Sequence, residues 1–229
     1  MAFVKGHWQL LALIAVIFTL WSTPVLVPLK IIVVLLHELS HGLAAVLTGG
    51  SIVEISISPQ QGGLAITRGG SRFITLTAGY LGSLLLGMAL LFAALRSKAD
   101  RAVVAGMGLL LLGVSAFYLR ELFALVFCVG LAAVLLAMAR WLDHRANDLA
   151  LRVIGLTSMI YVPFDIFSDT IARSHLQSDA WMLADEFGGT TMLWGGLWLV
   201  LSLLAIGASL RYGLGTSSNI AFGPAPKAD

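Results

Sequence analysis

The residues of this chain best suited to chemistry are His37, Glu38 and His41, which lie in the segment IIVVLLHELSHGLAAVL, residues 31–47. Histidines four positions apart lie on one face of a helix, one turn from each other, so both imidazoles can reach a single metal ion. Glu38 follows the first histidine and can contact a water molecule at that ion without being a ligand. This is the HExxH pattern, in which two histidines bind zinc and the glutamate is the general base.

The chemistry that this pattern indicates is metal-assisted hydrolysis. Zinc lowers the pKa of a bound water to about 7 and polarises a carbonyl, and the glutamate takes the proton as the water attacks. Ionisable side chains within a membrane span cost about 2.5–3.5 kcal/mol each when charged, and they usually have a function. A metal ion would satisfy these groups where lipid cannot. The alternative is a polar helix face that packs against other polar groups.

A catalytic zinc ion takes three protein ligands and a water, so a third ligand must come from elsewhere in the chain. The segment YVPFDIFSDT supplies Asp165 and Asp169 in apolar surroundings. We expect Asp165 to be the third ligand, with Asp169 as the alternative, and Pro163 to weaken the helix and help turn a carboxylate inward. A helix end near the membrane surface would also explain these aspartates. His175 and Asp179 lie in the polar segment RSHLQSDA, which favours a solvated loop or helix cap over ligands.

The elements that must position these residues are membrane helices. The chain is 59% hydrophobic and only 11% charged, whereas a soluble domain carries about 25% charged residues. A span needs about 20 apolar residues. We therefore expect an all-α polytopic membrane protein of six to seven transmembrane helices, in one domain over residues 1–211, with a disordered tail over 212–229. The candidate spans are residues 7–22, 25–48, 72–95, 102–119, 121–140, 153–172 and 191–211.

With these spans, an even number of crossings separates the second from the sixth, so both run in the same direction. His37 and His41 lie past the middle of the second span, and Asp165 lies at a similar distance into the sixth. The histidines and Asp165 are therefore expected at the same depth. The net charge of +2 gives no reason to expect nucleic acid as a partner. Cys128 is the single cysteine, which excludes an internal disulfide, and we interpret it as a small buried hydrophobe.

The segment from 51 to 68 differs from the rest of the chain. In SIVEISIS, Val53, Ile55 and Ile57 alternate with Glu54 and serines, the period of a strand, and LAIT alternates again after a Gly-containing turn. This pattern predicts a β-hairpin. An open sheet edge cannot face lipid, so the hairpin must lie at the interface or against protein.

The sequence HELSHG, residues 37–42, resembles the HExxH helix of the site-2 proteases, in particular their compact branch without a PDZ domain, over roughly residues 31–185. The hairpin is similar to the family's membrane-associated strands, on which an extended substrate pairs. The resemblance implies a zinc-dependent intramembrane protease with Zn²⁺ as cofactor and a transmembrane protein or peptide as substrate. It implies Glu38 as general base, with His37, His41 and Asp165 as ligands.

The resemblance also implies an integral protein of the bacterial plasma membrane with its active site nearer the cytoplasmic face. Lys5 before the first span agrees with this orientation. The larger set of basic residues then lies on the outer side, and the positive-inside rule favours the reverse orientation.

Two motifs depart from the family pattern. Where the family has G-P-x-x-N, this chain has GYLGS, with Gly79 and Ser83 at the outer positions and Tyr80 in place of proline. Ser83 could donate a hydrogen bond near the site, and Gly79, with Gly82 and Gly87, could instead allow close helix packing. Where the family has L-D-G, this chain has Phe-Asp-Ile around Asp165.

These departures leave two other functions open. One is a catalytically weak or inactive relative that binds zinc and retains membrane partners. The other is a transporter in which the histidines and aspartates form a metal or proton pathway. Transporters often contain repeated halves, and the absence of an internal repeat in this sequence disfavours that alternative.

Overall fold

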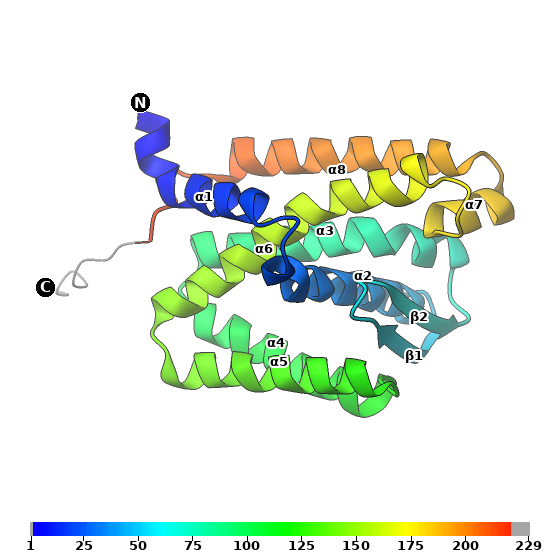
Figure 1. Ribbon diagram of the computed structural model, residues 1–229, viewed down its shortest axis with the longest axis horizontal. Helices are drawn as coiled ribbons and strands as arrows, with labels where there is room; N and C mark the ends of the chain where they lie inside the picture. Colours follow the sequence, from blue (N-terminus) through cyan, green and yellow to red (C-terminus); the bar gives the residue numbers. More distant parts are fainter. Residues whose placement is uncertain (1, 221–229) are drawn as a thin grey trace, which may run out of the picture.

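The computed structural model describes residues 2–220, which form a bundle of helices with one β-hairpin at one end (Figure 1). In chain order the elements are α1 (Ala2–Thr19), η1 (Pro24–Leu26), α2 (Val27–Leu47), β1 (Ser51–Ile57), β2 (Gly63–Arg68), α3 (Arg72–Arg96), α4 (Asp100–Tyr118), α5 (Leu122–Trp141), α6 (His144–Ile166), η2 (Phe167–Ala172), α7 (Asp179–Phe187) and α8 (Thr191–Gly213).

Within the described residues, seven helices are long and apolar enough to cross a membrane: α1, η1 with α2, α3, α4, α5, α6 with η2, and α8. Together with the single two-stranded antiparallel sheet, they confirm the expected polytopic all-α fold. Pro163 does not end the sixth span, because α6 continues through it to Ile166 and then into the π-helical turn η2. The span is therefore continuous but has a changed helical pitch near its end.

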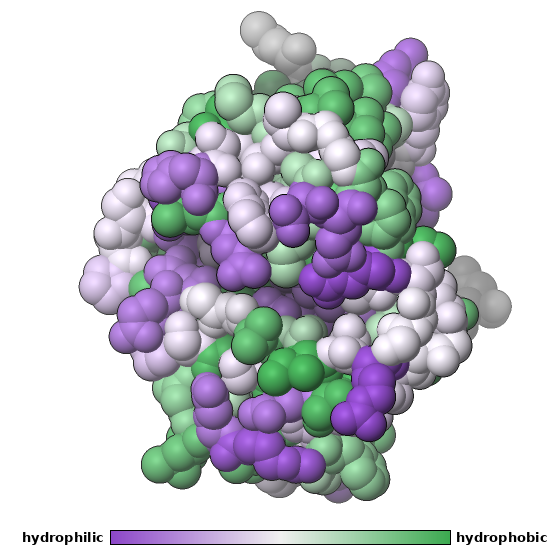
Figure 2. Space-filling model, turned by 90° about the vertical axis from the view of Figure 1, so that its right-hand side faces the viewer, coloured by the Kyte–Doolittle hydropathy of each residue, from purple (hydrophilic) through white to green (hydrophobic). Residues whose placement is uncertain are grey.

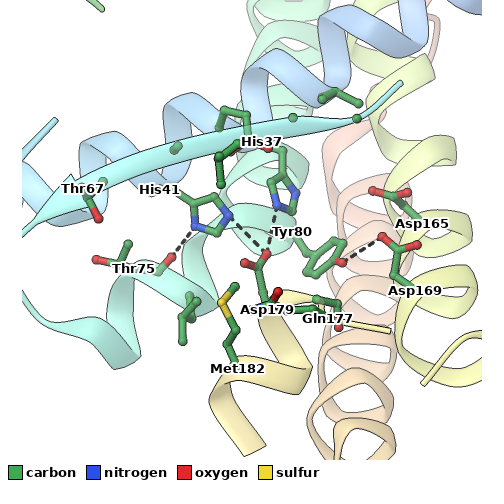
Figure 3. A pocket seen from close by; sticks show the side chains of 18 of the residues that line it. His37, His41, Thr67, Thr75, Tyr80, Asp165, Asp169, Gln177, Asp179 and Met182 are labelled. Carbon is green, nitrogen blue, oxygen red and sulfur yellow. Dashed lines mark hydrogen bonds and ion pairs between the residues drawn. The ribbon is translucent and has the colours of Figure 1, made fainter. Parts of the chain in front are cut away.

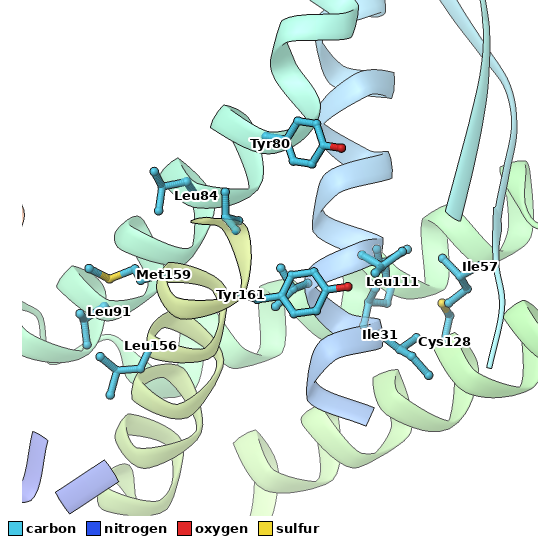
Figure 4. Packing of buried hydrophobic residues seen from close by; sticks show 14 of the residues in the cluster. Ile31, Ile57, Tyr80, Leu84, Leu91, Leu111, Cys128, Leu156, Met159 and Tyr161 are labelled. Carbon is cyan, nitrogen blue, oxygen red and sulfur yellow. The ribbon is translucent and has the colours of Figure 1, made fainter. Parts of the chain in front are cut away.

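The spans differ in how deeply they lie in the bundle. In α2, 67% of the span is buried within the protein, and in α6, 56%, whereas the other five have 17–39%. The α2 helix packs against α3, α6 and both strands. Figure 4 shows part of this core, with Leu84 and Leu91 of α3 near Leu156 and Met159 of α6. The two inner helices are thus shielded from lipid by the outer ones, and they can carry polar groups.

The hairpin lies where the alternating pattern predicts it. β1 pairs antiparallel with β2, with Ile55 opposite Ala65. Ile55 and Ile57 are buried, at 0% and 1% exposure, where β1 packs against α2, α4 and α5. Val53 does not share that face, because the register is irregular between Ile52 and Glu54, and it is 43% exposed. Both strands pack against α2, and β1 also contacts α4 and α5, so the hairpin is fixed on the bundle.

The polar segment before the last span contains a docked helix, α7. The Ser178 hydroxyl caps it by accepting from the Trp181 N–H at 3.3 Å, and Gly188 ends it at a φ of +86°. α7 packs against α3 and α8. An ion pair of 2.9 Å between Arg72 and Glu186 and an edge-to-face contact between the rings of Phe73 and Phe187 hold it there.

At the other end of the molecule, the chain after α8 runs along α1 (Figure 1). Residues 212–213 complete α8, and the Ser218 N–H donates to the Gly6 carbonyl at 2.8 Å. His7 Nδ1 lies 2.8 Å from Ser218 Oγ, and Arg152 donates to the Ser218 carbonyl and, at 2.6 Å, to Asp148. We call His7, Asp148, Arg152 and Ser218 the terminal cluster. Residues 221–229 of the expected tail lie outside the described residues.

Candidate metal centre

Two imidazoles from the middle and the C-terminal half of α2 meet one carboxylate beside the hairpin (Figure 3). His37 Nε2 lies 3.0 Å and His41 Nε2 3.2 Å from the same oxygen, Oδ2, of Asp179. The two imidazole rings stand edge to face with centroids 4.7 Å apart. Of residues 2–220, these three form a group whose metal-ligating atoms all lie within 4.8 Å of one another. The helical spacing of the histidines therefore produces the convergence that their sequence positions predict.

His41 is held in the orientation that a metal ligand needs. Its Nδ1 lies 2.6 Å from the Thr75 carbonyl oxygen on α3. A carbonyl oxygen only accepts hydrogen bonds, so Nδ1 carries the proton and Nε2 is directed at Asp179. Fixing the second ring nitrogen in this way sets the tautomer and the ring orientation of metal-binding histidines.

Asp179 is the first residue of α7, directly after the capping residue Ser178. Its side chain is buried, with 10% exposure, so desolvation opposes its ionisation, but the two nearby imidazoles outweigh that cost. The pKa of the Asp179 carboxyl is therefore held well below its ordinary value. Its position at a helix N-terminus also favours negative charge. Asp179 thus remains an ionised oxygen donor, which is the form that binds metals.

Gly79 on α3 supplies room beside the imidazoles. A Cβ atom at this position would overlap the Nε2 atoms of both His37 and His41. Two imidazole nitrogens and one carboxylate oxygen are a donor set of catalytic zinc sites. The donors, and the space that a glycine leaves at them, therefore fit a zinc ion. Gly82 and Gly87 have the packing role instead, because Cβ atoms there would overlap Ser40 and Ser158.

Glu38 lies beside this group without belonging to it. It is 5% exposed and lines a cavity of about 380 Å³ together with both histidines and Asp179. Strand β2 approaches it closely, because a Cβ at Gly63 would overlap the Glu38 carboxylate, and the Ala65 backbone amide is directed at it. Glu38 is thus next to the group of His37, His41 and Asp179, on the side that faces the hairpin.

Asp165 and Asp169, the expected ligands from α6 and η2, line the same cavity, so the expectation of a common depth agrees with the structure. Neither joins the two imidazoles, and Asp179 takes that place. Asp165 hydrogen-bonds with Tyr161, and Asp169 accepts from Tyr80 and pairs with Arg173. The structure therefore favours Asp179 over both of these aspartates as the third ligand, and the ligand set stays a prediction. The Tyr80 ring lies against His37, and its hydroxyl donates to Asp169 (Figure 3). The tyrosine side chain therefore stands between the Asp169 carboxylate and the His37 imidazole.

Ser83 does not point into the site. Its side chain is fully buried, and its hydroxyl donates to the carbonyls of Gly79 at 2.8 Å and of Tyr80 at 3.0 Å in its own helix. The expected hydrogen bond from Ser83 to the site is therefore not present in this arrangement.

The sequence contains a pattern that places Asp179 at the start of a helix, although the polar residues around it favour a solvated loop. The stretch SDAWMLADEF begins with a serine N-cap and places Ala180 and Leu183 on one side, the pattern of a short amphipathic helix. Both are fully buried. A capped helix docked through an apolar face can bring its first residue to a buried site, whereas a solvated loop cannot.

The cavity lies at the end of the molecule formed by the hairpin and α7. Figure 2 faces this end, and hydrophilic side chains gather there around a hollow, among hydrophobic ones. The lining includes β2 residues Gly63, Leu64 and Ala65, whose strand pairs only with β1 in the part of the chain that the structure describes. A free strand edge therefore borders the site.

One known protein family matches this chain over most of its length. The family model described as "Peptidase M50B-like" matches residues 10–209, which is most of the chain. No curated protein and no solved structure matches it significantly. The matched region contains the helix with His37 and His41, the hairpin and Asp179. The chain belongs to the Peptidase M50B-like family, and thus to the site-2 protease type of membrane metalloprotease.

Proposed function

We propose that this protein is a zinc-dependent intramembrane endopeptidase that hydrolyses peptide bonds in or near the transmembrane segments of other membrane proteins. The observation that carries the proposal is the convergence of His37, His41 and Asp179, with Glu38 beside them, in a cavity at the end of an inner membrane helix. Family membership supports the same reaction class.

The residues that would hold the metal are His37, His41 and Asp179. When bound, zinc would supply an activated water and polarise the carbonyl of the scissile bond. Glu38 would accept the proton of the attacking water and deliver it to the leaving nitrogen. Its burial between α2 and β2 keeps this carboxylate close to the reacting atoms and away from lipid.

The hairpin would hold the substrate. A transmembrane helix keeps its peptide bonds in its own hydrogen bonds, so it must unwind locally before hydrolysis. Strand β2 borders the cavity and has a free edge, which can pair with an extended segment by strand addition. The substrate backbone would then lie along Gly63–Ala65, beside Glu38.

The proposal places the protein in the bacterial plasma membrane, with the site nearer the cytoplasmic face. Seven apolar helices support the membrane location. Lys5, before α1, supports a cytoplasmic N-terminus.

The test is cleavage by the purified, zinc-loaded protein in liposomes, with a set of single-span membrane proteins that carry helix-destabilising residues as substrates. We expect defined products, located by mass spectrometry. Glu38→Gln should lower cleavage by at least about 10³-fold while zinc content stays unchanged, because it removes the proton acceptor and no ligand. The matched control is Glu54→Gln on β1, outside the cavity, which should cleave normally. Stoichiometric zinc without cleavage of any substrate would contradict the proposal.

A further inference from the structure

The helix that carries Asp179, α7, is a short element between two interruptions of the chain. It has nine residues, and isolated helices of this length are marginal in water. Before it, residues 173–178 form no regular helix or strand. After it, Gly188 and Gly189 have φ angles of +86° and +90°, a conformation that glycine adopts without strain. The position of α7 therefore depends on how its side chains dock on the bundle.

The apolar docking of α7 is small. Ala180 and Leu183 are fully buried, whereas Phe187 is 50% exposed. The ion pair between Arg72 and Glu186 lies at the surface, with side-chain exposures of 46% and 38%, and surface pairs of this kind contribute little to stability. An element with few buried apolar contacts opens locally at a low free energy.

The remaining buried residue of α7 is a charge, Asp179. Its Oδ2 atom lies 3.0 Å from Nε2 of His37 and 3.2 Å from Nε2 of His41, both on α2 (Figure 3). Burial of a carboxylate costs free energy unless the charge has a partner. A zinc ion held by all three side chains would be such a partner, and it would connect α7 to the inner helix α2.

The helix α7 and the segment before it also form one wall of the cavity, through Gln177, Ser178, Asp179 and Met182. The other walls belong to elements with larger buried faces. The spans of α2 and α6 are the two most deeply buried, and α3 has nine buried residues where α7 has three. Strand β2 is fixed by its pairing with β1. Of these walls, α7 is therefore the one that opens most easily.

We propose that α7 is a metal-coupled lid. Zinc bound by His37, His41 and Asp179 holds the lid closed, and loss of zinc lets α7 swing away as a unit about Gly188 and Gly189. The open lid uncovers the cavity and removes the third ligand, so the metal-free site is open and incomplete. This inference rests on the metal centre of the proposed function and adds a means of regulating that same site.

Hydrogen exchange, measured by mass spectrometry on the full-length protein in detergent, tests the lid without turnover. With free zinc at about 100 times its Kd, the amides of residues 182–187 should exchange at least about 10-fold more slowly than in chelator-treated protein, because a ligand that binds the closed form stabilises it. The amides of α4, which does not line the cavity, should exchange equally in both samples. Equal exchange of α7 in the two samples would overturn the inference.

Two variants separate the metal link from the other contacts of α7. In Asp179→Ala the exchange of α7 should no longer depend on zinc. The matched control is Arg72→Ala, which removes the exposed ion pair with Glu186 and should keep the zinc effect within about threefold of the wild type. A full zinc effect in Asp179→Ala would show that zinc acts on α7 by another route and would contradict the proposal.

Cysteine labelling gives a second readout that leaves every ligand in place. Ala180 is fully buried on the docked side of α7, so a maleimide reaches Ala180→Cys only when the lid is open. Removing zinc should speed this labelling at least about 10-fold, the effect of local opening. Asp185→Cys, at an exposed position of α7, should be labelled equally fast in both states, and the buried Cys128 in neither. Labelling of Ala180→Cys that zinc does not change would exclude the lid.

Failure of the lid and failure of the proposed function give different results. Zinc-dependent protection of α7 without cleavage of any substrate would remove the peptidase reaction and leave the lid in place. Cleavage by the wild type, together with exchange and labelling of α7 that do not respond to zinc, would remove the lid and leave the reaction.

Discussion

The terminal cluster and the candidate metal centre lie near opposite ends of the part of the chain that the structure describes, and they are organised differently. In the terminal cluster, Arg152 pairs with Asp148 and with the Ser218 carbonyl, and His7 bonds with the Ser218 hydroxyl. The charges of Arg152 and Asp148 are paired, and His7 has a hydroxyl as its partner. In the metal centre, His37 and His41 both turn the same ring nitrogen to a single oxygen of Asp179, beside a glycine that leaves room there.

The difference shows how to read ionisable residues in a membrane protein. Every buried charge needs a partner. Where the partners are an arginine and an acid one helical turn apart, the cluster is complete within the chain and its role is to hold elements together. Where imidazole nitrogens and a carboxylate oxygen converge, as they do at His37, His41 and Asp179, the arrangement is suited to binding a cation. Each prediction below changes one cluster and uses the other, or a neighbouring residue, as its control.

The largest effect is expected from removing a histidine of the metal centre. His41→Ala should abolish stoichiometric zinc binding, because one imidazole and one carboxylate are too few ligands for a catalytic site. His7→Ala, which removes a histidine of similar burial from the terminal cluster, should keep full zinc content. Zinc per protein is measured by mass spectrometry after purification without chelators. Equal zinc in the two variants would contradict the distinction between the clusters.

Replacing Asp179 should have a smaller effect on zinc binding than replacing His41, but a larger one than replacing Asp165. Asp179→Ala should weaken zinc binding by at least about 100-fold, more than the roughly 10–100-fold loss typical of groups that only support a ligand. Asp165→Ala changes the same cavity, and because Asp165 does not join the imidazoles it should keep the zinc affinity within about threefold of the wild type. Competition with a chromophoric chelator measures both affinities. The reverse order would restore Asp165 as the third ligand.

Substitutions in the terminal cluster are expected to leave zinc binding unchanged and to affect only stability. Arg152→Met leaves Asp148 buried without its partner and should lower stability by about 3–5 kcal/mol. Asp148→Leu together with Arg152→Met removes both charges and should recover part of that loss. Thermal unfolding in detergent gives the order of stabilities, and zinc content should equal that of the wild type in both variants. Loss of zinc from Arg152→Met would show that the clusters are coupled.

Much of this arrangement could be predicted because it depends on short-range patterns. Apolar length predicts the spans, a period of two predicts the hairpin, and a spacing of four brings His37 and His41 together. The third carboxylate depends on tertiary packing. Asp165 and Asp169 line the same cavity but do not join the imidazoles, and the contacts of Tyr80 with His37 and Asp169 cannot be read from the sequence. Asp179 reaches them because α7 docks through buried Ala180 and Leu183.

The separation of the ligating groups along the chain has a consequence for biogenesis. His37 and Asp179 are 142 positions apart. A ribosome therefore completes the helix with the imidazoles long before it makes the acid, and all but one of the seven spans precede that acid. During most of its synthesis the nascent chain therefore lacks one of the three groups that converge in the folded protein, and the candidate centre can form only after the sixth span is complete.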